Sequence, residues 1–491
     1  MIALRSHALP GWVWLPVLIV LCGLGARAPL VWHSRPFDVD EALYASFARE
    51  ISHENNPLLL GSLVDKPPLG FYVTALSFKL FTSPSEWAAR LPGFFASILS
   101  LAVLWSLARQ LYRNRLVAAL ATLFLALSPF DIAFSGTAFL DPQLTLWLLL
   151  ACATIVRGRW AWAGVFTGLA FATKQSALLF IPLVPMLGLI ASRGRVRRKQ
   201  LASFLLVALV SCLLPFVWGE ARGPDSSDWW ALGTANNTPG RLIRSDEVVP
   251  RALAWLGYLG NAASLPLLVA LLATGPAVLL TEIGRNPRSR ETAIDVALTT
   301  YGLGAMLVLW LVAFNLYARY IHPLVPLVGL LLARAMAGWV ALFKPGHRQR
   351  LGPLLAGVLL VAMGPQVLPA RAGDTLLNAS RQRYAGMAQV AAHLNAQPPG
   401  TIVYDHWLGW PLRWYTGQQR PQDMWLRVVY HPTPQAMAAD ALRQPDPLPR
   451  YFVAPDWAGA DPWLRALTEA GFRPQPVAQA GNLTLYRLEP P

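Results

Sequence analysis

Long apolar runs alternate with short polar segments over the first 370 residues of the chain. Each run approaches the ~20 residues that an α-helix needs to cross the hydrocarbon core of a membrane. Basic residues gather in the short segments between the runs, as they do in cytoplasmic loops. Placing those segments in the cytoplasm predicts about eleven transmembrane helices, with the N-terminus inside and the C-terminal tail outside. The predicted spans are residues 11–31, 87–108, 116–133, 139–156, 160–173, 176–192, 200–218, 253–281, 292–314, 320–341 and 351–370.

Two apolar segments determine this count. Residues 70–81 would reach about 18 Å as a helix, against about 30 Å of hydrocarbon, so we expect a helix lying on the outer surface. Residues 160–192 have basic residues at both ends. Both ends should therefore be cytoplasmic, which predicts a hairpin of two short spans with Lys174 at its outer turn.

The first outer loop, residues 32–86, is expected to contain a second surface helix. Apolar residues recur at helical spacing over residues 41–52, with Arg49 on the opposite face. This pattern predicts an amphipathic helix in the plane of the membrane, with Asp40 and Glu41 at its start.

The character of the chain changes after residue 370. Residues 371–491 are rich in proline, glutamine and aspartate, and short helical and strand patterns alternate along them. We therefore expect a membrane domain over residues 1–370 and a small α/β domain outside the membrane over residues 371–491. Its predicted helices are residues 384–395 and 462–471, and its predicted strands are residues 401–404, 451–454 and 483–488.

The composition agrees with a membrane protein. Of the 491 residues, 55% are hydrophobic and 14% are charged, whereas soluble domains carry about 25% charged residues. The net charge of +15 lies mainly in the loops between spans, so no nucleic-acid partner is expected. The three cysteines lie in apolar runs without a CxxC pair, so we expect inert thiols rather than a metal site or a disulfide.

Carboxylates follow the first predicted span, just outside the membrane. Asp40 and Glu41 stand at the start of the expected helix, where an acid can simply be a cap. A cap does not need a pair of acids, and a carboxylate at this place can act as a general base or a metal ligand. Asp141 lies at the outer end of the fourth predicted span, which allows it to converge with Asp40. The alternative for Asp141 is again a helix cap, with Pro142 in the first turn; Asp131 is a weaker candidate.

Three cations map to the outer face, where the positive-inside pattern makes them unusual. Lys66 precedes two prolines, Lys174 lies at the hairpin turn, and Arg319 begins the tenth predicted span. Each can extend to lipid headgroups or bind the phosphate of a lipid carrier, and the sequence leaves both interpretations open. His322 is more typical of an interfacial histidine than of a catalytic base.

At these residues the chain resembles the GT-C glycosyltransferases, specifically the bacterial branch of the family 39 type, the protein O-mannosyltransferase and lipid A aminoarabinose transferase group. The resemblance covers roughly residues 10–370, and the acid pair followed by Lys-Pro-Pro is its most specific part. The motifs that carry it are Asp40-Glu41-Ala42-Leu43-Tyr44, Lys66-Pro67-Pro68-Leu69, Ala89-Arg90-Leu91-Pro92, Asp141, Thr173-Lys174 and Arg319-Tyr320-Ile321-His322-Pro323.

The resemblance implies a GT-C fold, a polyprenyl-phosphate sugar donor, an extracytoplasmic active site and inversion at the anomeric carbon. It makes Asp40 the expected catalytic base or metal ligand, and we expect Glu41 and Asp141 to be further catalytic carboxylates. A divalent cation is the one cofactor considered, and Asp40 and Asp141 would be its ligands. Val39 stands where aminoarabinose transferases commonly carry arginine, which weakens the assignment to that sugar. The residues expected to bind substrate are Lys66, Arg90, Lys174, Arg319, Tyr320 and His322.

We therefore expect an enzyme that transfers a sugar to lipid A, a glycan or a protein hydroxyl of the cell envelope. It should span the bacterial inner membrane many times, with residues 371–491 in the periplasm. The main alternative is a transporter or flippase of lipid-linked sugars, which predicts inverted repeats and charges near the middle of the bilayer. The candidate residues lie at the ends of spans instead. A membrane acyl- or phosphotransferase and a non-catalytic scaffold are further alternatives.

Overall fold

The computed structural model describes residues 14–32, 35–237, 240–417, 426–444 and 448–490, and it divides into two compact units. The first unit comprises Met1–Trp32, Leu58–Gly70 and Arg90–Thr375. The second comprises His33–Pro57, Phe71–Ala89 and Leu376–Pro491. The tail therefore forms one unit with most of the first outer loop, whereas the sequence analysis grouped that loop with the membrane domain.

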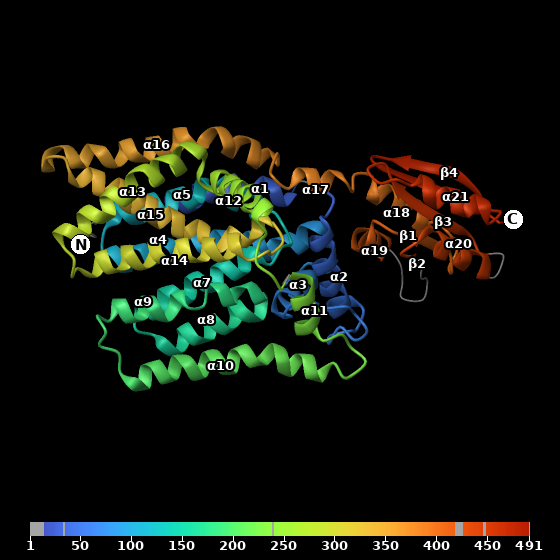
Figure 1. Cartoon of the computed structure of the whole chain (residues 1–491), viewed down its shortest axis with the longest axis horizontal. Coiled ribbons are helices and arrows are strands. Elements are labelled where there is room, and N and C mark those ends of the chain that lie inside the picture. The colour runs from blue at the N-terminus through green and yellow to red at the C-terminus, as the bar shows by residue number, and fades with distance from the viewer. Residues whose placement is uncertain (1–13, 33–34, 238–239, 418–425, 445–447, 491) are drawn as a thin grey trace, which may run out of the picture. The chain divides into compact units, whose positions relative to one another are not determined.

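The first unit is built from helices (Figure 1). Within it, α15 packs against α5, α13 and α14, while α8 packs between α7 and α10. These elements are α1 (Leu15–Trp32), α4 (Glu86–Tyr112), α5 (Arg115–Leu127), α6 (Pro129–Ser135), α7 (Asp141–Val156), α8 (Trp160–Thr173), η2 (Gln175–Leu179), α9 (Leu183–Ala191), α10 (Arg198–Ala221), α11 (Trp229–Asn237), η3 (Ser245–Glu247), α12 (Val248–Ala263), α13 (Leu265–Arg285), α14 (Arg290–Leu311), η4 (Ala318–Leu324), α15 (Val325–Ala341) and α16 (Pro345–Ala372).

The described helices make the chain a multi-pass membrane protein. Seven of them are long and apolar enough to cross a membrane, or eight if α5 and α6, bent by 58°, form one span. The shorter apolar segments α7, α8 and η2–α9 coincide with three further predicted spans. The predicted hairpin over residues 160–192 is confirmed as a pair of helices, while the count of eleven spans stays a prediction.

Two predicted spans are wrong as continuous helices, residues 116–133, which divide into α5 and α6, and residues 253–281. Residues 253–281 are divided between α12 and α13, and the break lies at Ser264. The backbone of Ser264 has a φ of 58° and a ψ of 145°, which no helix can contain. Hydropathy does not register this break because both flanking helices are apolar.

Small residues bring α8 and α10 together. A Cβ atom at Gly168 would lie 2.0 Å from Cβ of Ser211, and one at Gly164 would lie 2.8 Å from the carbonyl oxygen of Phe204. Close helix contact at small residues is the usual way in which membrane helices gain packing energy. The glycines of α8 therefore fix the position of the hairpin that carries Lys174.

The second unit combines helices with a five-stranded sheet of order β2-β1-β3-β5-β4. Strand β1 is parallel to β2 and β3, and β5 is antiparallel to β3 and β4. The register pairs Val403 with Val428 and Tyr451, and Phe452 with Tyr486. The elements are α2 (Val39–His53), α3 (Leu69–Leu80), α17 (Asn378–Gln382), α18 (Met387–Asn395), β1 (Ile402–Asp405), α19 (Gly409–Gly417), β2 (Arg427–Tyr430), α20 (Pro434–Arg443), β3 (Arg450–Pro455), α21 (Asp461–Glu469), β4 (Arg473–Ala480) and β5 (Leu483–Glu489).

The core of this unit lies between the sheet and the pair α20–α21. Phe452 of the central strands packs there with Met437 of α20 and Leu467 of α21. Every residue of β1 and β3 is buried, because α18 packs against the sheet as well. The α/β fold of the tail is confirmed, with strands β2 and β4 in addition to the three predicted ones.

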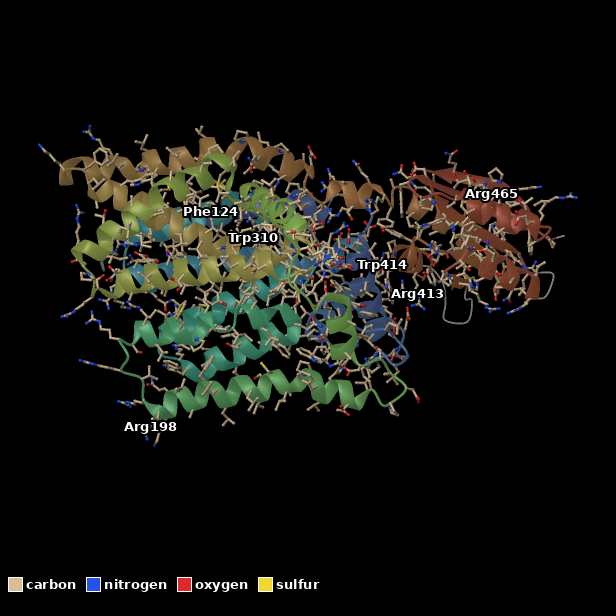
Figure 2. All side chains as sticks on the ribbon, viewed as in Figure 1. Phe124, Arg198, Trp310, Arg413, Trp414 and Arg465 are labelled. Atoms are coloured by element: carbon tan, nitrogen blue, oxygen red, sulfur yellow. The ribbon has the colours of Figure 1, made fainter. Side chains whose placement is uncertain are left out.

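Helix α2 is more enclosed than predicted. Its apolar face packs on α3, where Phe47 and Phe71 have ring centroids 5.1 Å apart. Arg49, predicted on an exposed face, is only 7% exposed. Its guanidinium lies 5.1 Å from the ring centroid of Trp414 of α19, a residue labelled in Figure 2, and donates to the Trp414 carbonyl at 2.9 Å. The predicted helix is thus confirmed. The prediction that Arg49 lies on an exposed face is wrong, because α19 covers this residue.

Candidate functional site

The acidic segment of the second unit is organised by a helix cap. Asp38 is the N-cap of α2, and its Oδ1 accepts a hydrogen bond from the Asp40 amide at 3.1 Å. The Glu41 carboxylate reaches back and accepts from the Asp38 amide at 3.1 Å. This reciprocal arrangement is a capping box, which satisfies two backbone donors at the start of the helix.

Two of the three acids in this segment are also held by the tail. Glu41 is fully buried and forms an ion pair with Arg381, whose Nη2 lies 3.1 Å from Oε2 and 3.2 Å from Oε1. Ser380 donates its hydroxyl hydrogen to Oδ2 of Asp38. Burial raises the pKa of Asp38, and the neighbouring charges of Glu41 and Asp40 act in the same direction. Asp40 is half-buried between these two fixed acids.

The first unit gathers the predicted cations. Lys174 Nζ lies 2.7 Å from Oδ1 and 2.9 Å from Oδ2 of Asp141, and both residues are buried. Lys66 and Arg319 lie close enough for their charges to act on Lys174. Tyr320 offers its ring to Lys174, with 5.4 Å between Nζ and the ring centroid. Four predicted substrate-binding residues are therefore brought together with Asp141.

The loop before Lys66 is fixed by buried hydrogen bonds. Arg222 donates to the carbonyls of Leu58 at 3.1 Å, Leu59 at 2.9 Å and Ser62 at 2.7 Å. Lys66 then pairs with its neighbour Asp65, Nζ to Oδ2, at 2.5 Å. A buried arginine donates hydrogen bonds to backbone carbonyls that would otherwise have no donor in the loop. Lys66 is thus presented from an ordered loop.

Two more residues, Gln175 and Gly233, contact the backbone beside Lys66. Gln175, directly after Lys174, donates to the Asp65 carbonyl at 2.7 Å. A Cβ atom at position 233 would lie 2.4 Å from the same carbonyl oxygen. Only glycine allows α11 to approach the backbone beside Lys66 this closely.

His322 belongs to a buried network beside the cations. Its Nδ1 lies 2.7 Å from Oγ1 of Thr145, and its Nε2 lies 3.4 Å from Oδ1 of Asp131 in ionic contact rather than in hydrogen-bond geometry. Asp131 in turn accepts from Arg27 and from the Ser97 hydroxyl, both at 2.6 Å. His322 is therefore a buried histidine with a hydrogen-bonding and an ionic partner. Asp131 belongs to this network and not to the acidic segment around Asp40.

Several of these residues were not predicted from the sequence. Arg27 carried a signal, because it is an arginine within an apolar span and such residues rarely lie there without a role. No sequence pattern indicates a role for Ser380 and Arg381, because they lie in an ordinary polar stretch of the tail. Arg90, predicted to bind substrate, is buried in α4, and its role stays a prediction.

The metal site predicted at Asp40 and Asp141 stays a prediction. Both carboxylate oxygens of Asp141 are engaged by Lys174. The part of the chain that the structure describes contains no group of three or more histidine, cysteine, aspartate or glutamate side chains that could hold a metal ion. Asp40 and Asp141 belong to different units, so their convergence stays a prediction. We derive no step through a metal ion.

An apolar pocket adjoins the histidine network. It is lined by residues of α4, α7, α9, η4, α14 and α15. Thr145 and Pro323 form part of its wall, next to His322. Apart from Thr145 the lining is hydrophobic, with leucines dominating.

Comparison with known sequences finds relatives over part of the chain. Residues 65–218 match the family described as dolichyl-phosphate-mannose-protein mannosyltransferase. The undecaprenyl phosphate-alpha-4-amino-4-deoxy-L-arabinose arabinosyl transferase of Yersinia pestis (strain Pestoides F) is 28% identical over 230 residues, covering 44% of this chain and 40% of the relative. A second such transferase, from Proteus mirabilis (strain HI4320), is 30% identical over the same shares. The chain thus spans about 40% of the length of the curated relatives that it matches.

Solved structures match over almost the whole chain. ArnT from Cupriavidus metallidurans in the apo state has a TM-score of 0.68 at 16% identity, covering 97% of this chain and 98% of that one. The same protein bound to undecaprenyl phosphate has a TM-score of 0.66 at 18% identity, with the same coverage. An Archaeoglobus fulgidus oligosaccharyltransferase has a TM-score of 0.54 at 13% identity, covering 91% and 69%. The chain therefore has the GT-C fold, as the resemblance implied, with helices able to span a membrane, and its residues 65–218 match the dolichyl-phosphate-mannose-protein mannosyltransferase family.

Proposed function

We propose that the protein is an inverting glycosyltransferase that uses a polyprenyl-phosphate sugar. It would transfer the sugar to a hydroxyl of an envelope acceptor, namely lipid A, a glycan or a protein, at the outer face of the inner membrane. The second unit would then lie in the periplasm. The observation that carries the proposal is the grouping of Lys66, Lys174 and Arg319, in a fold that binds undecaprenyl phosphate in ArnT.

The cations suit the phosphate of the donor. Lys66 and Lys174 each face a carboxylate, while Arg319 lies over the ring of Tyr317 at 4.0 Å. Arginine presents a planar fork of donors and lysine a compact charge, and both bind phosphate oxygens. As the bond to the sugar breaks, negative charge grows on the phosphate, so fixed cations stabilise the transition state more than the ground state.

Asp40 is the acid that we assign as general base. The acceptor hydroxyl attacks the anomeric carbon, its proton passes to the Asp40 carboxylate, and the bond from the carbon to the phosphate oxygen breaks. Polyprenyl phosphate leaves with the electron pair, and the configuration inverts. Phosphate is a good leaving group, so no general acid is required. Glu41 is ion-paired and Asp141 holds Lys174, so we assign both a positioning role instead of the catalytic role expected from the sequence.

The test is Asp40→Asn, assayed for sugar transfer in membranes with the native lipid donor. The amide keeps the size of the side chain but cannot take a proton, so we expect kcat to fall by about 10²–10⁴-fold, the usual contribution of a general base. Asp225→Asn is the matched control, because Asp225 is exposed in the loop between α10 and α11. Transfer at the wild-type rate by Asp40→Asn would overturn the assignment.

A further inference from the structure

The tail supplies side chains to the acidic segment that contains Asp40. Three acids stand within four positions there, at 38, 40 and 41. Like charges so close destabilise one another, so an arrangement of this kind needs compensation. Among the described contacts, Arg381 provides a positive charge to Glu41, and the Ser380 hydroxyl donates to Asp38.

The two contacts differ in strength and in what they fix. Arg381 is 4% exposed and Glu41 is fully buried, and Nε also reaches Oε2 at 3.2 Å. A two-pronged ion pair of this kind fixes the orientation of the carboxylate as well as its position. Ser380 fixes Asp38, whose other oxygen caps the Asp40 amide. Asp38 and Glu41, the acids before and after Asp40 in the sequence, are thus held by two consecutive residues of α17.

The chain just before the acids is held by a second part of the tail. The Phe37 amide donates to the Tyr415 hydroxyl at 3.2 Å, and the Phe37 ring lies 5.2 Å from that of Trp414. Tyr415 in turn donates its hydroxyl hydrogen to Glu86. Burial raises the pKa of Tyr384, three residues after Arg381, to about 12, and the negative charges of Asp38 and Asp40 act in the same direction. The acidic segment is therefore enclosed by residues from α17 and α19.

We propose that Ser380 and Arg381 are positioning residues that hold Asp40 in the geometry needed to accept the proton of the acceptor hydroxyl. The inference rests on the proposed function, because it takes Asp40 as the general base. Arg381 fixes Glu41, and Ser380 fixes Asp38. Asp40 lies between these two acids in the sequence, so its backbone is held from both sides. The C-terminal segment is then part of the active site and not only an appended domain.

The test uses two mild substitutions in the full-length protein in membranes, Arg381→Lys and Ser380→Ala. Lysine keeps the charge but loses the fork of donors, and alanine removes one hydrogen bond. We expect kcat to fall about tenfold in Arg381→Lys and about two- to tenfold in Ser380→Ala. KM for the lipid donor should stay unchanged, because the donor phosphate is assigned to the cations of the first unit. Arg381→Gln should lower kcat further than Arg381→Lys, so that retained charge gives partial rescue.

Controls separate positioning from folding and from the proposed function. Arg465→Gln removes an exposed arginine of α21, labelled in Figure 2, and should leave kcat and KM unchanged. Thermal unfolding in detergent shows how much of each variant is folded, and kcat is calculated per folded protein. Wild-type kcat in both mild variants, or a rise in KM at constant kcat, would overturn the positioning role while leaving Asp40 as the base. Full transfer by Asp40→Asn would overturn the proposed function itself.

Discussion

At the scale of single residues, both lysines among the grouped cations are paired with a carboxylate. Lys66 pairs with Asp65 and Lys174 with Asp141. Removing one partner of a buried pair leaves an uncompensated charge, whereas the intact pair is close to neutral. The pairs therefore allow several cations to lie together in a buried region without a donor present. An incoming phosphate can then share the lysine protons with the carboxylates.

Lys66 gives the sharpest residue-scale prediction. If it binds the donor phosphate, Lys66→Ala should lower kcat/KM for the lipid donor roughly ten- to hundredfold, because a charge-assisted hydrogen bond contributes about 1.5–3 kcal/mol. Lys66→Arg should restore activity only in part, since a guanidinium differs in shape and hydration from an ammonium. Steady-state kinetics with varied donor measure both.

The control for this measurement is Lys79→Ala, because Lys79 is exposed at the end of α3 and should be silent. If Lys66 only extends to lipid headgroups, both Lys66 variants will match the wild type. In that case the phosphate-binding role would be withdrawn, and the ordered loop before Lys66 would be a structural anchor.

At the scale of elements, the connection from β1 to α19 links the sheet to the acidic segment. Asp405, the last residue of β1, accepts hydrogen bonds from the amides of Trp407 at 3.0 Å, Leu408 at 2.8 Å and Gly409 at 2.7 Å. A carboxylate at a helix N-terminus is favoured by these donors and by the helix dipole. The helix that it starts carries Trp414 and Tyr415, which hold Phe37 before the acids.

Asp405 predicts a pH dependence of stability. Burial raises the pKa of Asp405 above its ordinary value of 3.8, although the three amides oppose this shift. The folded state therefore binds a proton more tightly than the unfolded state, so this residue contributes stability that is lost as pH rises from 3.8 through the raised pKa. The unfolding midpoint in detergent should fall over that window in the wild type.

The matched variant for this effect is Asp405→Asn, which cannot titrate. Its unfolding midpoint should fall less steeply with pH across the same window, because an amide does not bind a proton there. Equal slopes in the two proteins would contradict the assignment of the pH dependence to Asp405.

At the scale of the whole molecule, the distribution of charge sets the orientation in the membrane. The basic segment of residues 193–199 lies between α9 and α10. Reporter fusions at Arg197 and at Gly400 should indicate the cytoplasm and the periplasm respectively, because basic loops are retained inside. A periplasmic signal at Arg197 would reverse the topology, and with it the placement of Lys66 and Lys174 at the outer face.

The sequence by itself determined the features that depend on local pattern. The apolar runs gave the membrane helices because span length follows from the thickness of the hydrocarbon core. The helix after the acids, the hairpin with Lys174 at its turn, and the strands β1, β3 and β5 follow from periodicity in the same way. The weakly patterned β4 escaped detection because it is half exposed and carries Pro474 and Pro476, residues that normally argue against a strand.

Only the tertiary structure decided which of the candidate residues are partnered, and by what. Glu41 meets Arg381 across 340 positions, and Lys174 meets Asp141 across 33. A local pattern holds no information about such pairs, because they depend on how helices and loops pack after each has formed. The break at Ser264 and the burial of Arg49 under α19 have the same origin. Hydropathy and periodicity report what one segment prefers, whereas side-chain roles in this site are set by segments far apart in the chain.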